Sequence, residues 1–185
     1  MKLSAFIATS LDGYIARQDG NLDWLDRANA SMPAGEDCGY NAFIASVDTL
    51  VVGRMTYEKA LGFGDWPYGH RRVVVLSSSR PTIDEQLRKT VEHAHESPRS
   101  LATRLAREGA MHVYVDGGVT IRGFLQDGLI DEITITTIPV LIGEGRPLFG
   151  VITDDIPLSL KAVKVYSFGF VQATYAVNWK PKNED

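Results

Sequence analysis

Three segments of the sequence change abruptly from residues typical of buried strands to residues that can bind anions. They are 51–58 (VVGRMTYE), 73–80 (VVVLSSSR) and 113–120 (VYVDGGVT). A β-branched apolar run indicates a strand buried on both faces, and in an open α/β sheet ligands bind beyond the carboxyl ends of such strands. Free N–H groups at helix starts, hydroxyl groups and guanidinium groups all bind phosphate. The three junctions therefore predict a site for a polyphosphorylated ligand, with a dinucleotide as the natural candidate.

A carboxylate stands at the start of an apolar helical stripe. Asp37 precedes Tyr40, Ile44 and Val47 at helical spacing, so these residues share one face of a helix expected at about 37–46. In an apolar pocket, desolvation would favour the protonated form of Asp37, which suits a proton donor near neutral pH. The alternative is that Asp37 only caps the N-terminus of the helix.

A second carboxylate, Asp12, directly precedes Gly13 after the first predicted strand. An Asp-Gly pair is a strong turn signal. The alternative is a mobile loop that closes over a substrate, with Asp12 facing the pocket and Trp24 forming a lid over a flat ring. The residues alone favour neither interpretation.

The elements that would position these groups alternate along the first two thirds of the chain. We expect strands at 2–8, 48–53, 72–77, 90–94 and 111–116, and helices at 37–46, 55–61, 98–108 and 118–127. From Asp131 onward the apolar residues recur with period two, which predicts antiparallel strands at 132–138, 158–165 and 170–179. The fold class is therefore α/β: a three-layer mixed sheet with a parallel centre and an antiparallel C-terminal hairpin.

Composition limits the class of protein. The chain has 185 residues, of which 44% are hydrophobic and 23% charged, and its formal net charge is −4. We expect one domain, 1–185, with a substantial core. A general nucleic-acid binder would show a basic surplus, so we expect no nucleic-acid partner.

The remaining composition argues for a reduced compartment. Cys38 is the single cysteine, which excludes an internal disulfide. The first residues enter a strand directly, and no apolar run reaches the roughly 18 residues of a membrane span, so we expect a cytoplasmic protein without membrane contact. His93 and His95 share a face of a possible strand, but no nearby Cys or carboxylate cluster supports a metal site.

Four motifs resemble the dihydrofolate reductase-like superfamily, and more closely the reductase domain of the bifunctional riboflavin-biosynthesis deaminase-reductase. They are 10–16 (SLDGYIA), 46–58 (SVDTLVVGRMTYE), 115–118 (VDGG) and 139–149 (PVLIGEGRPLF). The resemblance runs from Lys2 to Trp179. It implies a dihydrofolate reductase-like fold and an NADPH-dependent oxidoreductase, a reductase of riboflavin biosynthesis or of similar chemistry, that forms a homodimer.

The resemblance also implies which residues bind the cofactor. The turn at 53–56 would hold the phosphates, the segment 77–80 would hold the adenosine 2′-phosphate, and the glycine pair at 117–118, often joined by a cis bond in the family, would approach the nicotinamide. The cofactor-binding residues are expected to be Ala8, Gly53, Arg54, Met55, Thr56, Leu76, Ser77, Ser78, Ser79, Arg80, Asp116, Gly117, Gly118, Val119 and Thr120. Beyond the serines and Arg80, nothing separates NADPH from NADH.

For the substrate, the resemblance implies a flat heterocycle of pterin or aminopyrimidine type, as in 5-amino-6-(5-phosphoribosylamino)uracil reductase. Asp37 falls at the family's spacing for an acidic substrate-binding residue, with Glu36 or Asp12 as alternatives for the proton donor. The other expected substrate contacts are Trp24, Tyr40, Thr136 and Phe149. No deaminase domain is present. The competing hypothesis is a nucleotide-binding sensor of the same fold without turnover.

Overall fold

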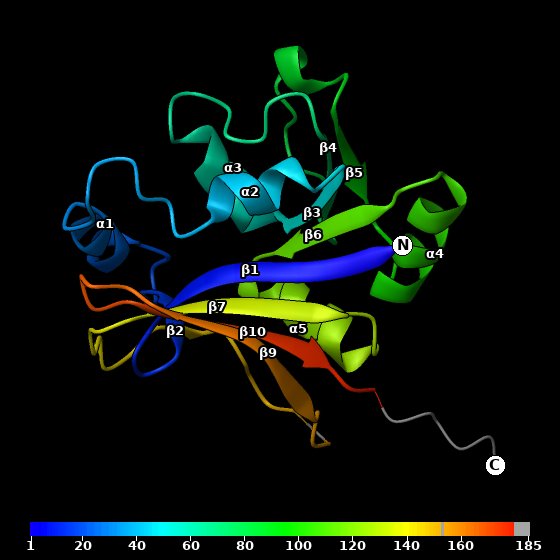
Figure 1. The fold of residues 1–185 in the computed structure, drawn as a ribbon. Coiled ribbons are helices and arrows are strands. Elements are labelled where there is room, and N and C mark those ends of the chain that lie inside the picture. Colours follow the sequence, from blue (N-terminus) through cyan, green and yellow to red (C-terminus); the bar gives the residue numbers. More distant parts are fainter. Residues whose placement is uncertain (153, 180–185) are drawn as a thin grey trace.

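An eight-stranded sheet organises the computed structural model, which describes residues 1–152 and 154–179. The strand order across the sheet is β5-β4-β3-β6-β1-β7-β10-β9. The strands are β1 (Lys2–Ser10), β3 (Thr49–Gly53), β4 (Arg72–Leu76), β5 (Val91–Ala94), β6 (His112–Asp116), β7 (Glu132–Ile138), β9 (Leu158–Val165) and β10 (Val171–Val177). Figure 1 shows β9, in orange, at the outer edge of the sheet.

The sheet is parallel from β5 to β7 and antiparallel at its last two strands. Strand β1 pairs in parallel with β6 and with β7, and β3 pairs in parallel with β4 and β6. Strand β10 runs antiparallel to both β7 and β9. The predicted fold class, a mixed sheet with a parallel centre and a C-terminal hairpin, is confirmed.

Helices cover both faces, because the central strands are apolar on both sides. On one face, α4 (Pro98–Arg107) and α5 (Gly118–Gln126) pack on inward residues such as Val113 and Val115. On the other, α2 (Tyr40–Ala45) and α3 (Arg54–Leu61) pack with Tyr114 and its neighbours. Since residues alternate along β6, Tyr114 and Asp116 point to the α2–α3 face.

Several short elements differ from the sequence expectations. The helix expected from residue 37 begins at Tyr40. A further helix, α1 (Asp23–Asn29), forms around Trp24, where the sequence predicted only a turn or a loop. Two short strands, β2 (Tyr14–Ala16) and β8 (Arg146–Pro147), form a separate antiparallel pair. A 3₁₀ turn, with Asp84 as its N-cap, forms at Glu85–Leu87. Short elements are hard to predict because tertiary contacts, not periodicity, decide them.

Two further observations concern the described residues as a set. None of their peptide bonds is cis, so the bond between Gly117 and Gly118 is trans, contrary to the geometry that the resemblance implied. None of the helices found there combines the length and hydropathy that crossing a bilayer requires.

Candidate active site

A cavity of about 1200 Å³ opens at the carboxyl ends of β3, β4 and β6. Typical ligand pockets measure roughly 300–1,000 Å³, so this one has room for a large ligand or for two ligands side by side. Of the fifteen residues predicted to bind a cofactor, the cavity wall includes all but the exposed Arg80. The three strand ends that the sequence singled out therefore do meet in one place.

The starts of α3 and α5 face each other on this wall. A Cβ atom built on Gly117 would lie 2.5 Å from Thr56 Oγ1, and one on Gly53 would lie 2.9 Å from Thr120 Oγ1. Gly117 also has a φ of 93°, which side chains disfavour. Glycine is therefore required where the two helix starts touch, and their first N–H groups, which lack helical partners, lie beside the same space.

Three consecutive serines form the wall beyond β4. The Ser77 Oγ lies 3.4 Å from Ser79 Oγ, and the Ser79 amide donates to Ser77 Oγ at 3.3 Å. The Ser77 carbonyl is 2.9 Å from His93 Nε2 and 3.3 Å from His95 Nδ1, and His95 is also on the wall. The segment is thus held in place by its backbone while its hydroxyl groups remain available for a ligand.

The cavity wall carries more cations than anions, although the whole chain is acidic. The cations are Arg54, Lys59, Arg122 and Arg146, and the carboxylates are Glu96 and Asp116. Glu96 is paired with Arg104 at 2.8 Å, and Arg54 with Glu58 at 2.8 Å. A surplus of cationic side chains beside two helix starts suits an anionic ligand.

Asp116 is the titratable group with the most unusual environment on this wall. Burial raises the pKa of Asp116 to about 6, and the hydrogen bond from the Gly117 amide, 2.8 Å long, offsets part of this rise. No lysine or arginine contributes to the shift. A carboxyl group with such a pKa is partly protonated near neutral pH, as a general acid must be.

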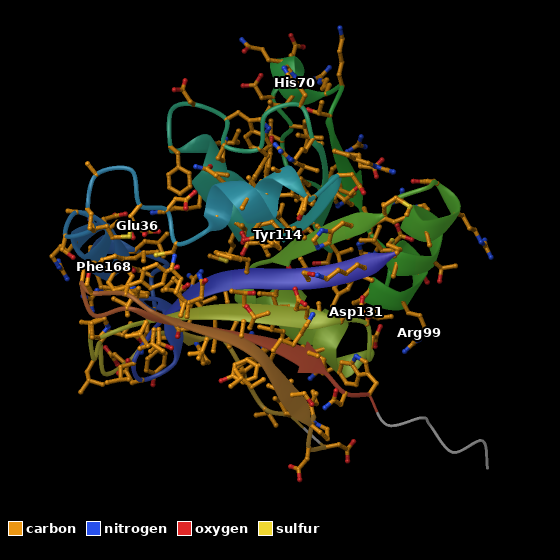
Figure 2. The ribbon with its side chains drawn as sticks, viewed as in Figure 1. Glu36, His70, Arg99, Tyr114, Asp131 and Phe168 are labelled. Atoms are coloured by element: carbon orange, nitrogen blue, oxygen red, sulfur yellow. The ribbon has the colours of Figure 1, made fainter. Side chains whose placement is uncertain are left out.

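Three tyrosines surround this carboxyl group. Burial raises the pKa of Tyr40 to about 12 and the pKa values of Tyr68 and Tyr114 further, and the charge of Asp116 adds to all three shifts. The Tyr114 hydroxyl donates to the Phe6 carbonyl at 2.8 Å. Figure 2 shows Tyr114 near the centre of the molecule. The phenols therefore stay neutral, and Tyr68 and Tyr114 line an apolar end of the cavity together with Phe6.

The three predicted proton donors lie elsewhere. Asp37 accepts hydrogen bonds from the Gly39 and Asn41 amides, both 2.8 Å long, and these bonds lower its pKa. The expected rise in the pKa of Asp37 is wrong, because the carboxylate caps the start of α2 and stays partly exposed. Glu36 accepts from the Cys38 amide at 2.7 Å, and Figure 2 shows it at one end of the molecule, apart from Tyr114.

Asp12 serves a structural role in the described structure. Its carboxylate accepts from the Ser10 hydroxyl at 2.6 Å and from the amides of Ile142 and Gly143, and these bonds lower its pKa. Asp12 is not on the cavity wall. The carboxylate instead ties the first loop to the segment before β8, so a role as proton donor has no support in its geometry.

The predicted substrate contacts are also absent from the cavity wall. Trp24 is only 2% exposed and packs with Ile138 and Tyr166 in a separate core, so the predicted lid is wrong. Thr136 is buried and accepts from the Gln172 amide at 2.8 Å rather than pairing with Asp37. Tyr40 packs against Phe6 near the cavity, and Phe149 is at the surface.

Comparisons with known proteins identify the family. Residues 1–171 match the RibD C-terminal domain. The chain belongs to the RibD C-terminal domain family. RibD C-terminal domains are reductase domains of riboflavin biosynthesis, and the dihydrofolate reductase-like fold inferred from the motifs is confirmed. A protein of Bacillus subtilis (strain 168) named only as uncharacterised, YwjB, is 36% identical over 168 residues, which cover 89% of this chain and 92% of YwjB.

Two solved structures place this RibD C-terminal-like chain among known folds. A candidate riboflavin biosynthesis protein from Shewanella sp. PV-4 is 38% identical, with a TM-score of 0.90 over 97% of this chain and 100% of that one. Dihydrofolate reductase from Enterococcus faecalis, in complex with NADP(H) and RAB-propyl, is 20% identical, with a TM-score of 0.63 over 96% of each chain. The second likeness concerns the fold alone.

Sequence reasoning missed Asp116 as an acid, although it named the residue as a cofactor contact. The available signal was the alternation in β6, which puts Asp116 on the same face as Tyr114. What could not be read from the sequence is that Tyr40 and Tyr68, from two distant segments, lie close enough for the charge of Asp116 to raise their pKa values.

Proposed function

We propose that this protein is an NADPH-dependent reductase that passes a hydride to a flat heterocycle of aminopyrimidine or pterin type, as 5-amino-6-(5-phosphoribosylamino)uracil reductase does. The observation that carries the proposal is a single cavity whose wall combines cationic side chains, the free amides of two helix starts and the desolvated Asp116 carboxyl group. The family membership supports a reductase, and the cavity supports a long anionic cofactor.

The donor set on the wall fits NADPH. The starts of α3 and α5 would hold its phosphates, and the serines at 77–79 would bind the adenosine ribose and its 2′-phosphate. Because Gly53 and Gly117 have no side chain, the two helix starts can lie close to each other, with their backbone amides directed at a ligand. When bound, the cofactor supplies the hydride. Its expected contacts remain the fifteen predicted residues, with Arg80 the least supported because it lies off the wall.

The protein's own contribution to the reaction is placement and a proton. Phe6, Leu22 and Leu25 offer apolar surface against which a flat ring can lie. In its protonated state Asp116 donates a hydrogen bond to a ring nitrogen or carbonyl oxygen, and it delivers the proton that must accompany the hydride. The neutral hydroxyl groups of Tyr68 and Tyr114 keep this end of the cavity free of a competing charge.

The proposal is tested by cofactor binding followed by turnover. Titration with NADPH should quench the cofactor fluorescence stoichiometrically and raise the melting temperature. Aminopyrimidine and dihydropterin compounds should then be screened for NADPH oxidation at 340 nm, a wavelength set by the cofactor and not by the protein. Absence of any fluorescence change and any thermal shift would remove the basis of the proposal.

A sensor without turnover is the second candidate. It is favoured by the ionised state of Asp12 and Asp37, since neither can donate a proton at neutral pH. It predicts NADPH binding but no oxidation against any member of the screen. The pKa of Asp116 is the observation that favours the reductase over this alternative.

We also propose that the protein is a homodimer that buries one face of the β9–β10 hairpin. All eight residues of β9 are exposed. The pairing shifts between Ala162 and Leu160, so Lys161 forms a bulge, and Leu160 and Val163 therefore point to the same face. The apolar residues that share this face are Leu158, Leu160, Val163, Val165 and Val171. Exposed apolar surface on an edge strand is a common site of self-association.

A further inference from the structure

Arg146 is a cation on the cavity wall that has no carboxylate partner within the described residues. Its Nε donates to the Gln18 carbonyl at 3.1 Å, and its Nη1 lies 3.3 Å from Met55 Sδ. A thioether is a weak acceptor. In contrast, Arg54 on the same wall is paired with Glu58. Apart from Nε, the N–H donors of Arg146 therefore have no acceptor stronger than the Met55 sulfur atom among the described residues.

The backbone that carries Arg146 is firmly held. A Cβ atom on Gly145 would come within 2.3 Å of the Ala16 carbonyl oxygen, so β8 lies directly against β2. Leu148 is buried, and its amide donates to the Gly13 carbonyl at 3.0 Å. Arg122 Nη1 donates to the Pro147 carbonyl at 2.9 Å. Such support pre-organises the guanidinium group before any ligand arrives.

The position of the guanidinium group indicates its ligand. Met55 is the second residue of α3, immediately after the end of β3, so Nη1 lies beside one of the helix starts that face the cavity. A Cβ atom on Gly20 would lie only 3.1–3.3 Å from the guanidinium atoms, so glycine leaves room for the side chain to cross from β8 to α3. The guanidinium group thus spans the cavity between the segment 18–20 and the start of α3.

We propose that Arg146 is a diphosphate-binding residue: its guanidinium group exchanges the Met55 sulfur for oxygens of the diphosphate bridge of a dinucleotide. This inference rests on the proposed function for the identity of the dinucleotide, NADPH. A planar guanidinium donates two parallel hydrogen bonds to a phosphate. The bond to Gln18 already links the same side chain to the loop after β2.

The test compares Arg146→Gln with the parent in NADPH titrations. Hydrogen bonds to charged groups correspond to an affinity change of roughly tenfold to a hundredfold, so the Kd for NADPH should rise by at least about tenfold. Arg88→Gln is the matched control, because it removes the same charge from an exposed side chain outside the cavity wall. It should leave the Kd unchanged. An unchanged Kd in Arg146→Gln would overturn the inference.

Two ligand fragments localise the effect. Adenosine 2′-monophosphate carries neither phosphate of the diphosphate bridge, so Arg146→Gln should bind it as the parent does; an equal loss for this fragment would mean a general charge effect and would overturn the assignment. Inorganic pyrophosphate should bind the parent, with calorimetry as the readout, and should bind Arg146→Gln at least tenfold more weakly. Equal binding of pyrophosphate would likewise overturn it.

The design separates this inference from the proposed function. If the parent fails to bind NADPH but Arg146→Gln loses pyrophosphate, the proposed cofactor is wrong and the diphosphate site stands. If the parent binds NADPH and Arg146→Gln binds it equally well, the proposed cofactor is supported and the diphosphate-binding role of Arg146 is wrong. Arg146→Lys keeps the charge but not the planar fork, and an intermediate loss of NADPH affinity is expected even if Arg146→Gln folds poorly. Parent-like affinity in both variants would contradict the role.

Discussion

At the scale of single residues, three carboxylates that look alike in the sequence have different environments. Asp12 and Asp37 are each held ionised by two backbone amides. Asp116 receives one amide bond and is surrounded by aromatic residues that desolvate it. The direction of a pKa shift depends on this balance between desolvation and hydrogen bonding, which is why we propose Asp116, rather than Asp12 or Asp37, as the proton donor.

Replacing Asp116 by Asn should separate acidity from hydrogen bonding. We expect kcat to fall by about 100-fold or more, the usual contribution of a general acid. The parent's kcat should decrease as pH rises through about 6, because the protonated form is the active one. Asp116→Asn should lack this titration. Steady-state kinetics would measure both effects between about pH 5 and 8, the range in which folded proteins are usually most stable.

Asp116→Asn should also change stability, with a sign that follows from linkage. The pKa of Asp116 is higher in the folded protein than its ordinary value of 3.8. The folded state therefore binds the proton more tightly, and the parent loses stability as pH rises from 3.8 to about 6. At pH 7 the variant should be more stable by up to roughly 3 kcal/mol, as urea unfolding would measure. A variant less stable than the parent at pH 7 would contradict a raised pKa of the Asp116 carboxyl group.

Asp37→Asn is the informative comparison. Asp37 has a lowered pKa and lies off the cavity wall, so this variant should keep the parent's kcat and its titration near pH 6. If Asp37→Asn lost the pH dependence of kcat near pH 6 and Asp116→Asn kept it, Asp37 rather than Asp116 would be the proton donor.

The sequence predicted the strand-end side of the candidate site better than the proposed substrate side. That three strand ends line one cavity was predictable, because ligand sites in open α/β sheets lie beyond the carboxyl ends of the strands. The substrate side was not, because burial of Trp24 under the β9–β10 hairpin and desolvation of Asp116 depend on contacts between distant segments. Spacing along a helix suggested a buried Asp37, but the helix starts three residues later and leaves it as a cap.

At the scale of elements, the segment that carries Arg146 depends on close packing between β2 and β8. Gly145→Ala would put a Cβ atom 2.3 Å from the Ala16 carbonyl oxygen, so one of the two strands must move. Overpacking of this kind costs about 1–3 kcal/mol. We expect that loss in urea unfolding, together with weaker NADPH binding because Arg146 moves with β8.

Gly123→Ala provides the matched control for Gly145→Ala. A Cβ atom on Gly123 would make only ordinary contact with Pro98 Cγ at 3.4 Å, and Gly123 lies inside α5. Alanine is favoured over glycine within helices by up to about 1 kcal/mol, so this variant should be unchanged or slightly more stable. Similar destabilisation by both substitutions would mean that the β2–β8 contact is not the cause.

At the scale of the whole molecule, the sheet ends in β9, whose apolar face is left exposed by the part of the chain that the structure describes. Figure 1 shows β9 beyond β10, with the helices gathered on the strands nearer the middle. The apolar alternation of 158–165 predicted the strand, but the bulge at Lys161 could not be predicted. The bulge is what aligns Leu160 with Val163, and hence gathers the apolar side chains on one side.

The proposed dimer makes a prediction that distinguishes the two faces of β9. Val163 is paired with Ala173 on the apolar face, whereas Ala162 is paired with Thr174 on the opposite face. Val163→Glu would bury a carboxylate in the dimer interface, which is costly without a partner charge, and should yield monomers at micromolar concentration in sedimentation velocity. Ala162→Glu adds the same charge one residue away and should leave the dimer intact. A monomeric parent, or equal dissociation of both variants, would refute an interface on this face. If the apolar face is buried in the dimer, a charge on it should weaken the dimer far more than the same charge on the opposite face.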